Sequence, residues 1–179
     1  GSTGDGWELD PDRYQLGVRQ CLSAAATHGF HVLIGALRPR TDEVRDRMVA
    51  WLQEIAADVS GDARLERLAA RRVTAFTICG PIGADLPPEF VESELVRLLE
   101  MGVPLSVYQL PQVTGYTVAT EVLNRLAARY PNFLMFKDTS GTDAVATSPN
   151  PLPGVFLVRG AEGDYLRWLR LGGGPYDGF

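Results

Sequence analysis

The sequence predicts an α/β fold built on a parallel sheet. Five short runs of apolar, β-branched or aromatic residues alternate with longer segments of helical period, and this repetition is typical of parallel sheets. The runs are apolar on consecutive residues rather than on alternate ones, which indicates strands buried on both faces. The predicted strands span residues 31–37, 73–79, 103–109, 133–137 and 155–158, and a sixth begins at 176–179.

The segments between these strands carry helix signals. The first, 10–27, opens with Asp10 and Pro11, which suit an N-cap and a first helical turn. The second, 41–58, is amphipathic, because its apolar residues recur at spacings of three and four. These residues are Val44, Met48, Trp51, Leu52 and Ile55. Further helices are predicted over 62–71, 88–101 and 117–129, with a shorter one over 164–171.

Such a sheet occurs in two architectures, an open doubly wound sheet and a closed (β/α)8 barrel. A dinucleotide-binding open sheet favours G-x-G-x-x-G after its first strand, but the glycines of residues 1–6 have another spacing and follow no strand. The glycines of 172–174 follow a helix and suit a helix C-cap. Five and a half strands are fewer than a barrel needs. Because the sequence also starts without Met and ends within a strand, we expect one domain, 1–179, that is an incomplete barrel truncated at both ends.

The composition narrows the range of partners. The 179 residues carry a formal net charge of −5, which argues against a nucleic-acid or anionic lipid partner. No apolar run approaches the roughly 18–20 residues that span a membrane. Cys21 and Cys79 give neither a disulfide framework nor metal-ligand spacing, and His28 and His31 have no third ligand nearby. We therefore expect a cytoplasmic protein without a metal or another cofactor.

Lys137 is the single lysine among 17 cationic side chains. It closes the apolar run 133–136, and the carboxyl ends of parallel strands are where α/β proteins carry their active sites. Desolvation there disfavours the ammonium form, so that the neutral amine can form a Schiff base with a carbonyl group. Arginine cannot replace it, because guanidinium keeps its proton. The alternative is a surface lysine left by chance in an arginine-rich sequence.

Tyr108 occupies the corresponding end of the preceding predicted strand. Neighbouring strands lie about 4.8 Å apart, so its phenol could reach a substrate bound to Lys137 and carry protons. The alternative is a half-buried packing residue.

The N-terminal residues Ser2, Thr3 and Gly4 offer hydroxyls and consecutive N–H groups that can cradle a carboxylate. A Gly-Ser start is also a common remnant of an expression vector.

Together these segments resemble the dihydrodipicolinate synthase / N-acetylneuraminate lyase family of pyruvate-dependent class I aldolases. The resemblance covers nearly the whole chain. It is carried by Gly1-Ser2-Thr3-Gly4-Asp5, Ile34-Gly35, Tyr108-Gln109-Leu110-Pro111 with Thr114-Gly115, Lys137-Asp138-Thr139-Ser140-Gly141, Gly160-Ala161-Glu162 and 172–179. It implies a (β/α)8 barrel of which this chain covers the end of strand two to the start of strand eight.

The resemblance also implies roles for individual residues. Lys137 would form the Schiff base with pyruvate or another 2-oxo acid, and Tyr108 would donate and accept protons. Thr3 would relay protons and, with Ser2, hold the substrate carboxylate. The implied substrate-binding residues are Ser2, Thr3, Thr139, Gly160 and Glu162. The full-length protein would be a homo-oligomer.

Three departures from the family pattern bear on the substrate. Dihydrodipicolinate synthases have an arginine where this chain has Val113, and a P-Y-Y element where it has Pro81-Ile82-Gly83. Sialic-acid lyases have an acidic pair where it has Glu162 alone. We therefore expect a lyase that makes or breaks carbon–carbon bonds of a 2-oxo acid, with or without dehydration, but not a dihydrodipicolinate synthase. The alternatives are a degenerate member that binds a 2-oxo acid without turnover, and a chain that is inactive because its barrel does not close.

Overall fold

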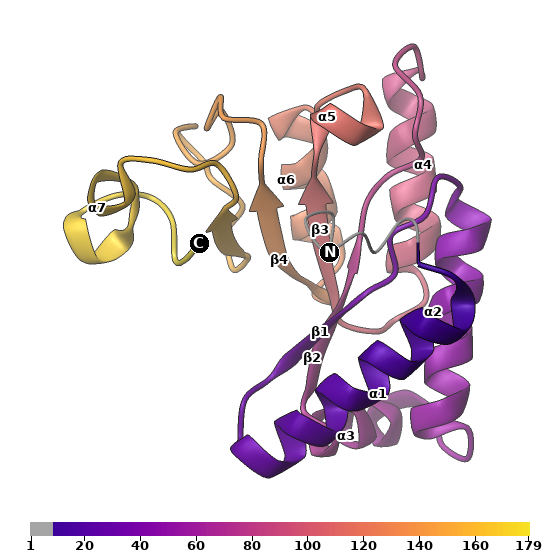
Figure 1. Ribbon diagram of the computed structural model, residues 1–179. Coiled ribbons are helices and arrows are strands. Elements are labelled where there is room, and N and C mark those ends of the chain that lie inside the picture. Colours follow the sequence, from indigo (N-terminus) through magenta and orange to yellow (C-terminus); the bar gives the residue numbers. More distant parts are fainter. Residues whose placement is uncertain (1–8) are drawn as a thin grey trace.

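The computed structural model describes residues 9–179, which form a five-stranded sheet flanked by helices (Figure 1). The strands are β1 (Val32–Gly35), β2 (Val73–Ile78), β3 (Leu105–Gln109), β4 (Phe133–Asp138) and β5 (Phe156–Arg159). Every neighbouring pair is parallel, and the order in the sheet is β1-β2-β3-β4-β5. Parallel strands that follow one another in chain order, joined by helices except between β4 and β5, are the arrangement of part of a (β/α)8 barrel, as the sequence predicts.

The helices connect the strands in the predicted order. They are α1 (Pro11–His28), α2 (Thr41–Ala56), α3 (Gly61–Ala70), α4 (Pro88–Leu99), α5 (Pro111–Thr114), α6 (Thr120–Arg129) and α7 (Tyr165–Trp168), followed by the 3-10 turn η2 (Arg170–Gly172). Asp10 caps α1, because its side chain accepts a hydrogen bond from the Arg13 N–H. None of the helices in the described part of the chain is long and apolar enough to cross a membrane.

One face of the sheet packs against helices and forms the core. The predicted apolar face of α2 is confirmed, and all five of its residues are buried in that core. They pack in one cluster with strand residues such as Phe76, Leu105 and Phe136, and with α4 and α6 residues such as Leu95 and Leu123. This face is the outer face of the partial barrel. Figure 1 shows α7 lying apart from the other helices, beyond the β5 edge of the sheet.

An irregularity in the pairing of β3 with β4 sets which residues face the core. Leu105 pairs with Phe133, but the next residue, Ser106, pairs with Met135. Leu134 is thus left without a partner on β3, as in a β-bulge. From there the register is regular, and it places Tyr108 beside Lys137 and Gln109 beside Asp138.

The prediction of a sixth strand over 176–179 is wrong, because no continuous ladder forms there. Residues 176–179 make only isolated bridges, among them one between Gly178 and Val158. The ladder with β5 is interrupted because the Leu157 N–H donates to the side chain of Asp177, at 2.8 Å, rather than to a backbone carbonyl. Two smaller differences concern helices: the helix predicted from residue 117 begins at Thr120, and the four-residue α5 is not predicted at all.

Candidate active site at the carboxyl ends of β3 and β4

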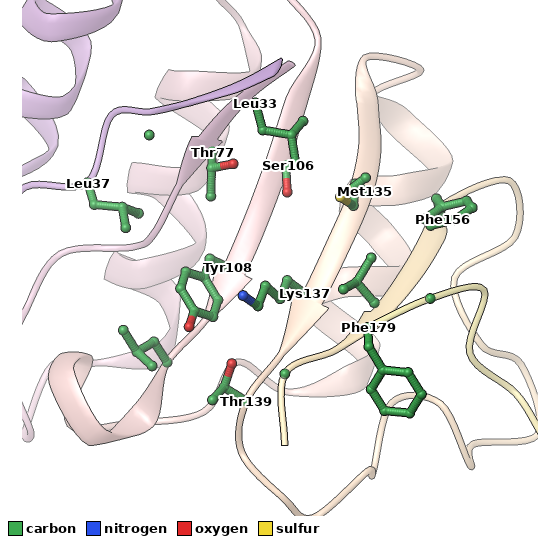
Figure 2. A pocket seen from close by; sticks show the side chains of 15 residues that line it. Leu33, Leu37, Thr77, Ser106, Tyr108, Met135, Lys137, Thr139, Phe156 and Phe179 are labelled. Atoms are coloured by element: carbon green, nitrogen blue, oxygen red, sulfur yellow. The ribbon is translucent and has the colours of Figure 1, made fainter. Parts of the chain in front are cut away.

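Lys137 and Tyr108 lie side by side on the inner face of the sheet, opposite the helical core. Each comes from the carboxyl end of its strand, β4 and β3 respectively, and the strand register pairs the two residues directly. The Lys137 Nζ lies over the Tyr108 ring, 4.7 Å from its centroid. Figure 2 shows the lysine side chain reaching toward the tyrosine. A primary amine and a phenol can therefore act on the same bound molecule.

A cavity of about 710 Å³ opens above these two residues, within the range of small-molecule sites. Its polar lining residues are Thr77, Ser106, Tyr108, Lys137 and Thr139. The other lining residues are apolar or glycine, among them Leu33, Leu37, Leu110, Met135, Phe156, Val158 and Phe179. Of the described residues that line the cavity, Lys137 carries the sole charge. A bound anion or cation would thus meet one formal charge on these walls.

Gly160 and Thr139 confine the lysine at the ends of β5 and β4. A Cβ atom on Gly160 would lie 3.1 Å from Lys137 Cε and would collide with the Thr139 hydroxyl oxygen. The lysine stem and the Thr139 hydroxyl therefore both lie close to the space that a side chain at residue 160 would take. The Thr139 Oγ1 is buried, and none of the described groups forms a hydrogen bond with it. This hydroxyl is a spare hydrogen-bonding group next to the amine.

A second row of polar residues lies one position further along the same strands, on the outer face. In this row Gln109 pairs with Asp138, and Asp138 with Arg159. The Gln109 Nε2 donates to Asp138 Oδ1 at 3.1 Å, and the Ser140 N–H donates to the same oxygen at 2.8 Å. The Gln109 Oε1 accepts from the Val118 N–H at 2.9 Å. These bonds hold the strand ends immediately after Tyr108 and Lys137.

Arg159 continues this outer row into a buried ion pair. Its Nε and Nη2 donate to the two carboxylate oxygens of Asp143, at 2.8 and 3.1 Å, and the Tyr176 hydroxyl donates to Asp143 Oδ1 at 2.8 Å. Burial alone would raise the pKa of Asp143, but the hydrogen bonds from Arg159 and Tyr176 hold it below its usual value. The pair ties the loop after β4 to the last residue of β5.

A small apolar cluster flanks Tyr108 at the carboxyl ends of β1, β2 and β3. It consists of Leu37, Cys79, Tyr108 and Leu110, with Val113 packed against it. Burial raises the pKa of the Cys79 thiol to about 12, so it stays protonated at neutral pH and is no competing nucleophile.

The predicted site residues fall into three groups. Lys137, Tyr108, Thr139 and Gly160 all line the cavity. Glu162 is exposed in the loop after β5 and is not among the lining residues. Ser2 and Thr3 lie outside the described residues.

Sequence reasoning missed the outer row of Gln109, Asp138 and Arg159. The signal for this row in the sequence is the polar residue that ends each of the three strands, directly after Tyr108, Lys137 or Val158. Within residues 9–179, no group of three or more histidine, cysteine or acidic residues is placed to hold a metal ion.

The sequence matches no protein-family model and no curated protein. The structure, however, is similar to solved structures. It superposes on a dihydrodipicolinate synthase from Cyanidioschyzon merolae with lysine bound, with a TM-score of 0.71 and 21% identity over 98% of this chain and 54% of that one. It also superposes on YagE, an E. coli K12 prophage protein of the dihydrodipicolinic acid synthase family in complex with pyruvate, with a TM-score of 0.73 and 16% identity over 99% of this chain and 56% of that one.

A 2-keto-3-deoxygluconate aldolase from Picrophilus torridus is similar over 83% of this chain and 48% of its own, with a TM-score of 0.56 and 16% identity. The chain thus spans about half the length of these structures. At such identities the likeness establishes the fold, that of part of a (β/α)8 barrel. It agrees with the resemblance that the sequence motifs carry.

Proposed function

We propose that this chain is part of a lyase that joins Lys137 to a 2-oxo acid as a Schiff base. The enzyme then makes or breaks a carbon–carbon bond next to that Schiff base. The chain has the fold of about half of a dihydrodipicolinate synthase structure. The observation that carries the proposal is the pairing of one amine and one phenol across neighbouring strands, in a cavity of substrate size. The amine nitrogen of Lys137 lies 4.7 Å from the centroid of the Tyr108 ring.

The proposed reaction begins with the neutral Lys137 amine, which attacks the ketone carbon of the 2-oxo acid. A proton moves to the former carbonyl oxygen, and loss of water from this carbinolamine gives an iminium ion. The iminium withdraws electrons from the bond that is made or broken. In this proposal the Tyr108 phenol donates the proton that leaves with water and takes up or returns the proton of the reacting hydroxyl. Water finally hydrolyses the iminium and restores the free amine.

Several observations support this assignment over a packing role. The Lys137 stem lies against Gly160 at the end of β5, where a Cβ atom would be 3.1 Å from Lys137 Cε. The hydrogen-bonded outer row fixes the strand ends that carry both groups. Among the structural neighbours, YagE was solved in complex with pyruvate, and the Picrophilus protein is an aldolase of a 2-oxo acid.

The departures in the sequence argue against dihydrodipicolinate synthesis. Val113 packs against the apolar cluster beside Tyr108 and offers no guanidinium for a second carboxylate. The Pro81-Ile82-Gly83 segment supplies no phenol, and the nearby Tyr116 hydroxyl donates to the Pro81 carbonyl oxygen at 2.7 Å. For the full-length protein we propose a homo-oligomer, which light scattering measures.

The decisive experiment traps the Schiff base in the full-length gene product. Treatment with pyruvate and borohydride is expected to add to the peptide of Lys137 the mass of one pyruvic acid less one oxygen atom. The matched control is Lys137→Arg, which keeps the charge but cannot lose its proton, and it should gain no mass. An unmodified wild-type peptide would reject the proposal.

The second candidate function is binding of a 2-oxo acid without turnover, and it is favoured by the missing phenol at 81–83. It predicts that pyruvate binds and is trapped, while no carbon–carbon cleavage, condensation or dehydration occurs over a panel of 2-oxo acids. Turnover of any of these substrates would exclude it.

A further inference from the structure

We infer that the second substrate of this site is an uncharged, apolar aldehyde, rather than a carboxylated or polyhydroxylated one. The inference rests on the proposed function, because it concerns the molecule that reacts with the 2-oxo acid held on Lys137. It depends on which side chains lie below and above the reactive pair in the cavity.

The inner face of the sheet is layered, and the hydroxyl groups of Thr77 and Ser106 lie in the layer below the reactive pair. Thr77 on β2 pairs with Gly35 on one side and with Ser106 on the other, two residues before the carboxyl-end layer of Tyr108 and Lys137. A substrate that enters from the carboxyl ends of the strands meets Lys137 before it meets these hydroxyls. The hydroxyls therefore suit the 2-oxo acid rather than its partner.

The walls beside and above the reactive pair are apolar on the Tyr108 side, where Leu37 lies beside Tyr108 and Leu110 lies two residues beyond it. Leu37 and Leu110 are each 6% exposed, line the cavity and form one cluster with Cys79 and Tyr108. Val113 extends the cluster. On the Lys137 side the wall consists of Gly160 and of Thr139, whose hydroxyl is buried against Gly160. A chain of several hydroxyl groups would lose its hydrogen bonds to water against these walls, and each polar group left unpaired is unfavourable.

The charges point the same way. Apart from Lys137, none of the described residues that line the cavity is charged. Lys137 becomes the iminium, so it is already used by the first substrate. A second carboxylate next to Leu37 and Leu110 would be buried with no cation among the described lining residues, which is strongly unfavourable. An aryl or alkyl group, by contrast, gains free energy from burial there.

The reaction balances without a redox partner. The enamine formed from pyruvate on Lys137 attacks the aldehyde carbon, a new carbon–carbon bond forms, and the aldehyde oxygen takes a proton. Water then adds to the iminium, and the product leaves as a 4-hydroxy-2-oxo acid with an apolar substituent on carbon 4. The reverse direction releases pyruvate and the same aldehyde.

The test measures how the full-length gene product condenses pyruvate with each of three aldehydes: benzaldehyde, glyceraldehyde and succinic semialdehyde. We expect kcat/KM for benzaldehyde to exceed the other two at least tenfold. Borohydride trapping with pyruvate alone is run in parallel. If the adduct on Lys137 forms but glyceraldehyde or succinic semialdehyde reacts as well as benzaldehyde, the inference is wrong and the Schiff-base function stands. If no adduct forms, the proposed function fails and this inference falls with it.

Two variants sharpen the test. Val113→Arg is expected to move the preference toward succinic semialdehyde by at least tenfold, because it adds a guanidinium beside the apolar cluster. Leu110→Asn should lower the ratio of benzaldehyde to glyceraldehyde. Leu166→Asn is the matched control: Leu166 is 79% exposed on α7, outside the cavity, and this variant should leave the ratio unchanged. An equal change of the ratio in both asparagine variants would overturn the inference. Where a variant fails to fold, the wild-type ranking decides alone.

Discussion

The two faces of the sheet differ most at the last two residues of β3, β4 and β5. The inner row, Tyr108, Lys137 and Val158, faces a cavity. The outer row, Gln109, Asp138 and Arg159, is buried and tied by side-chain hydrogen bonds to the neighbouring strand or to the loops that follow. The rows are one residue apart on the same strands. The difference teaches that the reactive groups are held in place by the residues behind them, a requirement for any site that must be precise.

The contrast continues toward the middle of the sheet. On the outer face Phe136 and Val107 are packed in the core, whereas their neighbours Met135 and Ser106 line the cavity. Substitutions on the two faces should therefore separate stability from chemistry.

The largest expected effect is on the inner face, for Lys137→Arg. We expect turnover to fall at least about 10³-fold, because no Schiff base can form. The melting temperature should stay within a degree or two, since Lys137 is no part of the core. Steady-state kinetics and thermal unfolding check both parts. A variant with wild-type turnover would show that the inner row is not catalytic.

On the outer face, Phe136→Ala is expected to lower the free energy of unfolding by about 3–5 kcal/mol, since it removes a side chain that is 1% exposed in the core. Met135→Ala is the matched control, one residue away on the cavity face, and should cost clearly less. Urea denaturation of both variants measures the difference. Equal losses would mean that the two faces are equally packed.

The buried ion pair at the end of the outer row gives a pH-dependent prediction. The pKa of Asp143 is lower in the folded protein than in the unfolded chain, so its contribution to stability is present above the unfolded value, about 4, and is lost as the pH falls through the folded value. We expect Asp143→Asn to cost about 1–3 kcal/mol at pH 7 and less as the pH falls below 4. Denaturation at several pH values measures this. A cost that does not change with pH would rule out the ion pair as its source.

The smallest expected effect concerns Gly160→Ala. Its methyl group would press on Lys137 Cε and the Thr139 hydroxyl, and both are side chains that can shift. We expect adduct formation with pyruvate to slow by about tenfold, or about 1.4 kcal/mol. Gly17→Ala is the control, because its Cβ would meet nothing within 4 Å on α1. A rate equal to that of the control would show that the lysine is not confined by Gly160.

The sequence predicted the order of strands and helices because long apolar runs and helical periodicity are local signals. It also predicted that Tyr108 and Lys137 would be neighbours, since consecutive strands of a parallel sheet usually pair. The sixth strand failed because one side chain, Asp177, takes the N–H of Leu157 that a ladder would need. No local pattern reports such a competition.

The outer row could not be predicted for a related reason. Whether Asp138 meets Gln109, and Arg159 meets Asp143, depends on strand register and on the path of a loop, not on the residue types alone. The expectation for Glu162 came from the family resemblance only, and the loop after β5 leaves this side chain exposed. The roles of Ser2 and Thr3 stay predictions.

The unpaired Leu134 in the bulge of β4 has a consequence for the identity of the site. Side chains alternate between faces, so a regular ladder in which Leu134 paired with Ser106 would exchange the two rows. The Asp138 carboxylate would then face the cavity, and the Lys137 side chain would face the helices. An irregularity of a single residue therefore sets which face of the sheet each later side chain of β4 occupies. It determines whether an acid or an amine faces the incoming molecule.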